Sequence, residues 1–156
     1  MALFKAPVAP DAIQIFRLIE TDVLGCAISR PFALDDYEWP TAEHYYQAMK
    51  YPGRPRFHDI RTAPTVELAR KHAHGWLKRK RKDWSAVRTT VMMRALYTQA
   101  QIYNDFKTAL LATGEKPIQE VAQYDYFWGT GRDQRGENQY GLLLMKLRDK
   151  LRAEIT

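Results

Sequence analysis

Residues 39–50 read WPTAEHYYQAMK, and this stretch decides the local fold because it sets ionisable groups at helical spacing in an aromatic segment. Thr41 is a favourable N-cap, and no proline or glycine follows before residue 52, so we expect a helix that ends near residue 51. Glu43, Gln47 and Lys50 stand at i, i+4 and i+7 and would share one face of it. In one interpretation, that face forms one wall of a catalytic site. In the alternative interpretation, Glu43 is stabilised by the helix dipole and the other two side chains are solvated.

The composition is typical of a globular chain with a hydrophobic core. The chain has 156 residues, of which 46% are apolar and 27% charged, so we expect a single domain over residues 1–156. One cysteine, Cys26, excludes an internal disulfide, and four scattered histidines make a metal site improbable. With no membrane-length apolar run and no signal-peptide pattern at the start, the sequence predicts a cytoplasmic protein with no membrane partner.

The residues before 39–50 show strand patterns, and the residues after them show helix patterns. Alternation in Ile13–Ile19 and the turn after Phe32–Leu34 predict short strands or a hairpin before residue 40. Further helices are expected at 56–62, from Pro64 in a first turn to Gly75, from an Asp83 N-cap, at 103–112, and from an Asn138 N-cap to the C-terminus.

Much of the net charge of +6 comes from residues 70–88, whose centre is a basic tract between Trp76 and Trp84. We define this tract as Lys78, Arg79, Lys80, Arg81 and Lys82. Cations flanked by aromatic rings suit a nucleic-acid backbone, so the five residues are candidate nucleic-acid contacts. A solvated charge run is the alternative interpretation.

A second unusual segment, residues 124–137, combines aromatic residues, glycines and charge directly before the last helix. Gly129 and Gly131 would let the backbone approach an anion, and Arg132 and Arg135 would add positive charge. The helix start at Asn138 would supply free backbone amides. Ordinary turn glycines are the alternative, and no strand-GxGxxG-helix arrangement supports a dinucleotide site.

Taken together, five motifs resemble the NADAR or YbiA-like family. They are WPTAEHYYQAMKY at 39–51, the helix from Asp83 to Leu96, LLATG at 110–114, DYFWGTG at 125–131, and residues 138–148. The resemblance covers about residues 24–152. It implies a compact, mostly helical α+β domain around a small sheet, and hydrolysis of an N-glycosidic bond at ribose C1 without a cofactor.

The resemblance implies functional roles for Glu43, Lys50, Trp84, Asp125 and Trp128. Glu43 would stabilise an oxocarbenium-like transition state, and Asp125 would orient the ribose or Lys50. Lys50 is either a phosphate or hydroxyl contact or an amine that attacks C1 of the opened sugar. The two indoles would stack on a base, although Trp84 also fits a core position.

Three functions remain open from the sequence. The leading hypothesis is removal of ADP-ribose from ADP-ribosylated guanine in DNA or in a nucleotide, and a DNA-ADP-ribosylating toxin is then a candidate partner. The alternatives are an N-glycosidase of phosphorylated ribosylaminopyrimidine intermediates of riboflavin synthesis and a non-catalytic ADP-ribose or nucleic-acid binding module. Residues 24–29 read LGCAIS where relatives often have Phe-Ser-Asn, which predicts a changed substrate contact.

Overall fold

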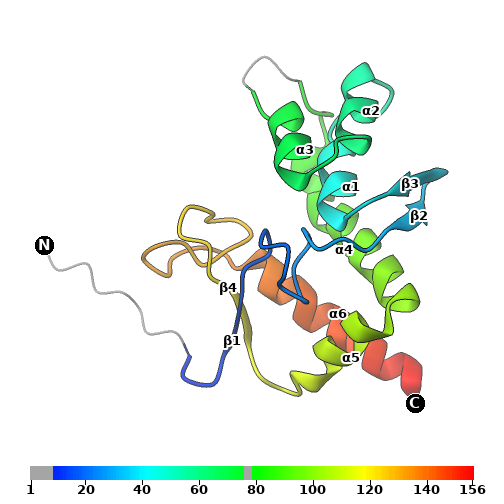
Figure 1. The fold of residues 1–156 in the computed structure, drawn as a ribbon. Coiled ribbons are helices and arrows are strands. Elements are labelled where there is room, and N and C mark those ends of the chain that lie inside the picture. Colours follow the sequence, from blue (N-terminus) through cyan, green and yellow to red (C-terminus); the bar gives the residue numbers. More distant parts are fainter. Residues whose placement is uncertain (1–8, 76–78) are drawn as a thin grey trace, which may run out of the picture. The chain divides into compact units, whose positions relative to one another are not determined.

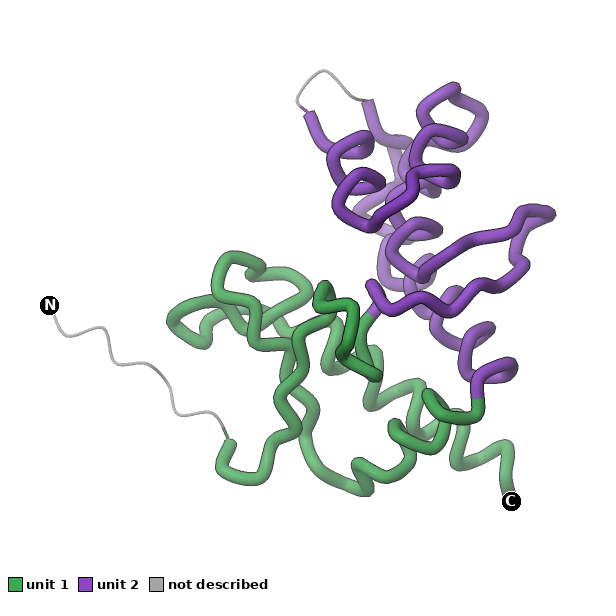
Figure 2. Tube along the Cα trace, viewed as in Figure 1, with its two compact units in different colours: residues 1–25, 104–156 green, residues 26–103 purple. Residues whose placement is uncertain are grey.

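The computed structural model describes residues 9–75 and 79–156, and it divides the chain into two compact units (Figure 2). Unit 1 combines the N-terminal residues through Gly25 with Asn104–Thr156, whereas unit 2 is the continuous segment Cys26–Tyr103. Lys78 of the basic tract lies outside the described residues. No helix in the described ranges is long and apolar enough to cross a membrane.

Unit 2 begins with a β-hairpin and continues as four helices (Figure 1). Strands β2 (Phe32–Leu34) and β3 (Tyr37–Trp39) pair antiparallel, as the sequence predicted. Asp35 and Asp36 between them both adopt positive φ, which suits a tight hairpin turn. The helices are α1 (Ala42–Ala48), α2 (Pro55–Arg61), α3 (Val66–Ala73) and α4 (Trp84–Ile102).

Helix α1 is the centre of unit 2. It packs against α2, α3 and α4, and all seven of its residues are buried. Thr41 is its N-cap: the hydroxyl accepts the backbone N–H of His44 at 3.1 Å. Because the carbonyl of Ala63 can only accept, the His44 Nε2 carries the proton toward it at 3.0 Å, and Nδ1 accepts from the Thr41 hydroxyl at 2.7 Å. His44 therefore holds α1 in place.

Unit 1 joins two distant parts of the chain through a short parallel sheet (Figure 1). Strand β1 (Ile13–Ile15) pairs with β4 (Ile118–Glu120), with Ile13 opposite Ile118. Helices α5 (Asn104–Ala112) and α6 (Gln139–Ile155) pack against each other, and α6 also covers β4. The buried stripe of α6 includes the expected leucines, Leu144, Leu147 and Leu151.

The predicted α+β class is confirmed, but several details were wrong. Helix α1 ends at Ala48 instead of near residue 51. Pro64 precedes the cap of α3, because the Thr65 hydroxyl caps that helix. The Asp83 carboxylate makes no capping bond and pairs with Arg81 instead.

Strand β4 was missed altogether, since three residues are too few to show a period. Asn138 stands at the start of α6, but its side chain makes no capping bond. It spans β4 instead, accepting the N–H of Glu120 and donating to the carbonyl of Ile118. Asn138 thereby fixes the register between α6 and β4.

Candidate functional site

Among the described charged groups of unit 2, the Glu43 carboxylate is the most enclosed, with none of its surface exposed. Arg70 of α3 donates to its Oε1 from Nη1 at 2.9 Å, and Gln47 donates to the same oxygen from Nε2 at 2.7 Å. The Cys26 thiol donates to Oε2 at 3.2 Å, while the Glu43 backbone N–H returns a bond to the Cys26 carbonyl. Three donors and one opposite charge thus stabilise the ionised carboxylate in a buried position.

The predicted shared face of Glu43, Gln47 and Lys50 is therefore buried, with exposed fractions of 0%, 2% and 5%. This burial contradicts the interpretation in which Gln47 and Lys50 are solvated. Among the described residues, the Gln47 side-chain oxygen has no hydrogen-bond partner. Its amide cannot turn over without losing the bond to Glu43, so the oxygen is held as an acceptor.

Lys50 lies just after α1, above two aromatic rings. Its Nζ is 5.5 Å from the centre of the Tyr46 ring and 5.9 Å from that of Trp84. The centres of the Tyr46 and Trp84 rings lie 5.0 Å apart, and Trp84 is buried at the start of α4. An ammonium group at this distance from two rings gains cation–π stabilisation. Base stacking by Trp84 stays a prediction.

The ring of His74 reports the charges around this cluster. The pKa of His74 is lowered by desolvation first, then by the positive charges of Lys50 and Arg70, while the Glu43 charge raises it. His74 itself is exposed, as expected from the sequence. The charges of Glu43, Lys50 and Arg70 therefore all act on the exposed ring of His74.

The described part of the basic tract is largely exposed. Arg79, Lys80 and Lys82 face solvent, whereas Arg81 binds the Asp83 carboxylate, with Nη2 to Oδ2 at 2.8 Å. The backbone N–H of Arg81 donates to the carbonyl of Lys50 at 2.8 Å. The tract is thus connected directly to the end of α1. Contact of the five basic residues with nucleic acid stays a prediction.

The remaining predicted site residues belong to unit 1, where Asp125 is paired with Arg17. Arg17 Nη2 donates to Asp125 Oδ2 at 2.9 Å, and Asp125 Oδ1 accepts the backbone N–H groups of Phe127 and Trp128. Burial raises the pKa of Asp125, but the hydrogen bond and charge of Arg17 and the two backbone bonds lower it further, below its ordinary value. Asp125 is therefore ionised at neutral pH.

A second unit 1 carboxylate, that of Glu120, also contacts Arg17. It accepts the backbone N–H of Arg17 at 3.3 Å and that of Ala122 at 2.8 Å. Burial raises the pKa of Glu120, backbone bonds and the Arg17 charge lower it, and Asp125 raises it, with a net increase. Two neighbouring carboxyl groups thus have pKa values shifted in opposite directions, a pattern common at acid–base sites.

The aromatic loop packs tightly around Trp128. The indole is buried against Phe127 and Tyr140, and the Arg17 guanidinium lies 5.9 Å from its ring centre. A Cβ at Gly129 would lie 2.8 Å from the Asp125 carbonyl, so this glycine is required by close packing. Gly131 has a φ of +73° and lies against a tyrosine ring. Binding of substrate by these residues stays a prediction.

Sequence reasoning missed Arg70, Cys26, Arg17 and Glu120. Arg70 could not be assigned to the site, because its contact with a residue 27 positions earlier leaves no periodic signal. Cys26 falls in the segment that departs from the family pattern, yet it still supplies a contact to Glu43. Across the described ranges, no group of three His, Cys, Asp or Glu side chains is arranged to hold a metal ion.

Comparison with known proteins supports one family. A NADAR domain model matches residues 16–152. The N-glycosidase YbiA of Shigella flexneri serotype 5b (strain 8401) is 34% identical over 126 residues, covering 81% of this chain and 79% of that protein. The chloroplastic riboflavin biosynthesis protein PYRR of Zea mays is 35% identical over 163 residues, covering 92% of this chain and 26% of that protein.

A solved structure gives the same result for the fold. The NMR structure of the E. coli protein YbiA superposes with a TM-score of 0.82 at 29% identity, covering 99% of this chain and 95% of that one. The family model spans most of the sequence, including residues 39–51 and 125–131. The chain therefore belongs to the NADAR domain family and has the YbiA-like α+β fold.

Proposed function

We propose that this protein is an N-glycosidase in which Glu43 is the central catalytic group. The observation that carries the proposal is the fully buried Glu43 carboxylate, which accepts hydrogen bonds from Gln47 of α1, from Arg70 of α3 and from the Cys26 thiol. An ionised carboxylate in a site of low dielectric stabilises positive charge far better than one in water. The names of the bacterial relatives, N-glycosidase YbiA, support the same reaction class.

The proposed reaction replaces a C1–N bond of ribose by a C1–O bond. As the bond to the base nitrogen breaks, its electron pair leaves with the base and positive charge develops on C1 and the ring oxygen. Glu43 stabilises that charge and accepts a proton from the water that attacks C1. The proton is returned to the leaving nitrogen, so the carboxylate is regenerated. Such a group is typically worth about 10²–10⁴-fold in rate.

Three neighbours of Glu43 have roles that follow from their contacts. Arg70 is 29% exposed, so it is the member of the cluster that a phosphorylated ligand meets at the surface. The Gln47 oxygen is an acceptor for a ribose hydroxyl, which would satisfy a buried polar atom. Lys50 supplies a second cation for phosphate, or its amine attacks C1 of the opened sugar.

The substrate that we favour is ADP-ribosylated guanine, in DNA or as a nucleotide. The supporting observation is the exposed basic tract, whose Arg81 is bonded to the backbone of Lys50. Cations beside the cluster suit the phosphates of a nucleic acid. The second candidate, a phosphorylated ribosylaminopyrimidine of riboflavin synthesis, is supported by the name of the maize relative.

The test is product release from both substrates by wild type and two variants. Glu43→Gln keeps the shape of the side chain but removes its charge, and we expect hydrolysis to fall by about 10²–10⁴-fold. Glu67→Gln is the matched control, because Glu67 also lies in the first turn of a helix but is exposed, and it should retain full activity. Folding of both variants is checked by circular dichroism.

Guanine-ADP-ribosylated oligonucleotide and the ribosylaminopyrimidine phosphate are offered separately to each protein. Faster release of guanine than of pyrimidine supports the favoured substrate, and the reverse result supports the second candidate. Binding of either compound without turnover by wild type would contradict the enzymatic proposal and support a binding module. Turnover by folded Glu43→Gln at the wild-type rate would exclude Glu43 as the central group.

A further inference from the structure

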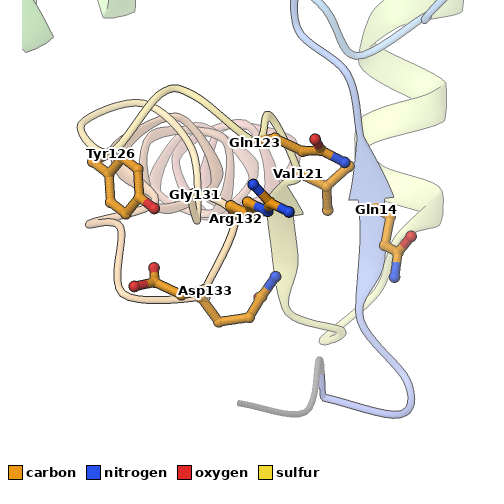
Figure 3. A pocket seen from close by; sticks show the side chains of 8 residues that line it. Gln14, Val121, Gln123, Tyr126, Gly131, Arg132 and Asp133 are labelled. Carbon is orange, nitrogen blue, oxygen red and sulfur yellow. The ribbon is translucent and has the colours of Figure 1, made fainter. Parts of the chain in front are cut away.

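The chain segment that carries Asp125 also lines a pocket of unit 1 (Figure 3). The pocket has a volume of about 570 Å³, and Gln123 and Tyr126, which stand on either side of Asp125 in the sequence, both belong to its wall. The Asp125 side chain itself is 26% exposed. Contacts that fix this segment therefore fix both a predicted catalytic carboxylate and one wall of a cavity.

The backbone of Arg17, which follows β1, is attached to the end of β4. The Glu120 carboxylate accepts the Arg17 N–H at 3.3 Å through Oε2 and the Ala122 N–H at 2.8 Å through Oε1. The Arg17 carbonyl packs so closely against Gly25 that a Cβ there would lie 2.8 Å from it. These contacts place the Arg17 side chain beside the segment that carries Asp125.

The Arg17 guanidinium contacts two of the predicted site residues at once. Its Nη2 donates to Asp125 Oδ2 at 2.9 Å, and its Cζ lies 5.9 Å from the centre of the Trp128 ring. A planar guanidinium carries its N–H donors in fixed directions, so it can hold a carboxylate in one orientation. The Arg17 side chain is only 5% exposed, which is too little for it to meet a substrate itself. Arg17 can therefore act on a ligand only through its neighbours.

The Asp125 carboxylate keeps one acceptor position in this arrangement. Oδ1 accepts the backbone N–H groups of Phe127 and Trp128 at 3.0 and 2.8 Å. Within residues 9–75 and 79–156, Oδ2 accepts a hydrogen bond from Arg17 alone. Because each carboxylate oxygen has two lone pairs, Oδ2 can accept one more hydrogen bond from an outside donor. Burial raises the pKa of Asp125, but Arg17 and the two backbone bonds lower it further, so this acceptor is ionised.

We infer that Arg17 is a positioning residue, which holds the Asp125 carboxylate so that Oδ2 accepts a hydrogen bond from a ribose hydroxyl of the substrate. A hydroxyl bonded to a carboxylate gains electron density, and this stabilises the positive charge that develops on C1 and the ring oxygen. The hydrogen bond therefore strengthens in the transition state, and loss of Arg17 lowers kcat/KM. The inference rests on the proposed N-glycosidase function, but it concerns unit 1 alone.

A double-mutant cycle tests whether Arg17 acts through Asp125, with the substrate that wild type hydrolyses. Arg17→Met should lower kcat/KM by about 10–10²-fold, since a misplaced positioning contact can cost about that much. Asp125→Asn should cost at least as much, and the double variant should lose no more than about twofold beyond Asp125→Asn. Arg152→Met is the matched control, because it removes a unit 1 arginine that pairs with the exposed Glu115, and it should keep kcat/KM. Losses that multiply in the double variant, or wild-type kcat/KM in folded Arg17→Met, would overturn the inference.

Arg17→Lys separates positioning from charge. The ammonium keeps the positive charge but lacks the planar fork, so the pKa of Asp125 should stay below its ordinary value while kcat/KM recovers only in part. In Arg17→Met the pKa of Asp125 should rise, because no cation then opposes the effect of burial. Both titrations are followed by ¹³C NMR of the carboxyl group without substrate. Full recovery of kcat/KM in Arg17→Lys, or an unchanged pKa of Asp125 in folded Arg17→Met, would contradict the positioning role.

Failure of this inference and failure of the proposed function give different results. If wild type hydrolyses neither substrate, or if folded Glu43→Gln keeps the wild-type rate, the proposed function fails. If wild type is active and Glu43→Gln is not, but the Arg17 variants keep full kcat/KM, only the role of Arg17 fails. Circular dichroism verifies folding, and Arg17→Lys with Asp125→Asn completes the cycle in case Arg17→Met does not fold.

Discussion

The ion pair between Glu43 and Arg70 should respond very differently to the loss of each partner. Glu43 is fully buried, whereas the Arg70 side chain is 29% exposed. Arg70→Met therefore leaves an enclosed carboxylate without its counter-charge, while Glu43→Gln leaves a guanidinium that can turn toward water. We predict that Arg70→Met destabilises the protein more than Glu43→Gln does.

The magnitude follows from the geometry. Unit charges 2.9 Å apart attract each other by about 6 kcal/mol at an effective dielectric constant of about 20. Desolvation and partial exposure of Arg70 cancel more than half of this attraction, so we expect Arg70→Met to cost about 2–3 kcal/mol. Glu43→Gln keeps an acceptor for Gln47 and should cost about 1 kcal/mol. The double variant should cost about as much as Glu43→Gln alone, because no buried charge remains.

Urea unfolding of the two single variants and the double variant measures these differences. For a chain of this length, 1 kcal/mol corresponds to about 2–4 °C in Tm, so Arg70→Met should melt about 4–12 °C below wild type. Glu115→Gln, which breaks the exposed pair of Glu115 with Arg152, is the control and should cost less than about 1 kcal/mol. Additive costs, or a larger cost for Glu43→Gln than for Arg70→Met, would refute the reasoning.

The ring of His74 provides a second readout that a purely structural role would not move. The Arg70 charge lowers the pKa of His74 and the Glu43 charge raises it. Arg70→Met should therefore raise the pKa of His74 measured by NMR, and Glu43→Gln should lower it. Shifts of the same sign in both variants would contradict the arrangement.

Three further predictions concern Lys50, the basic tract and His44. If the Lys50 amine attacks the opened sugar, borohydride during turnover should leave a sugar adduct on this residue by mass spectrometry, and active turnover without an adduct supports the phosphate role. Replacing Lys80 and Lys82 by Gln should lower kcat/KM on modified DNA and flatten its salt dependence but spare a small ADP-ribosyl nucleotide, and an unchanged salt slope on DNA would contradict a nucleic-acid role. Desolvation lowers the pKa of His44 despite its bond to Ala63 and the nearby Glu43 charge, so the unfolded chain takes up a proton below about pH 6.5 that the folded protein takes up only at lower pH. Stability should thus fall with decreasing pH by up to about 1.4 kcal/mol per pH unit, and His44→Gln should flatten this slope in urea unfolding between pH 5 and 7.

Local signals in the sequence predicted much of the fold. The Thr41 cap, the turn at Asp35 and Asp36, and the helical periods all act over a few residues, so their physics is visible in a short window. Strand β4 was not predictable in this way, because its three residues are defined by a partner more than 100 positions away. The Asn138 side chain was assigned to a helix cap because nothing in the neighbouring residues shows that it binds the backbone of β4 instead.

The same distinction between local signals and contacts between distant elements applies to the candidate site. Helical spacing put Glu43 and Gln47 on one face, and the structure joins them by a hydrogen bond. The burial of that face and the counter-charge from Arg70 depend on how α3 packs against α1, which no single helix encodes. Contacts between elements were therefore the part of the site that the sequence concealed.

The parallel pairing of β1 with β4 has a consequence for how the chain is made. Residues 26–103 form a unit that is continuous in sequence, whereas β1 must wait for a partner that is synthesised about 105 residues later. At about 5–20 residues per second, that delay lasts roughly 5–20 s, during which the apolar strand Ile13–Ile15 has no partner strand. The N-terminal strand can therefore enter its sheet only after β4 has been made, so the sheet of unit 1 forms late in synthesis.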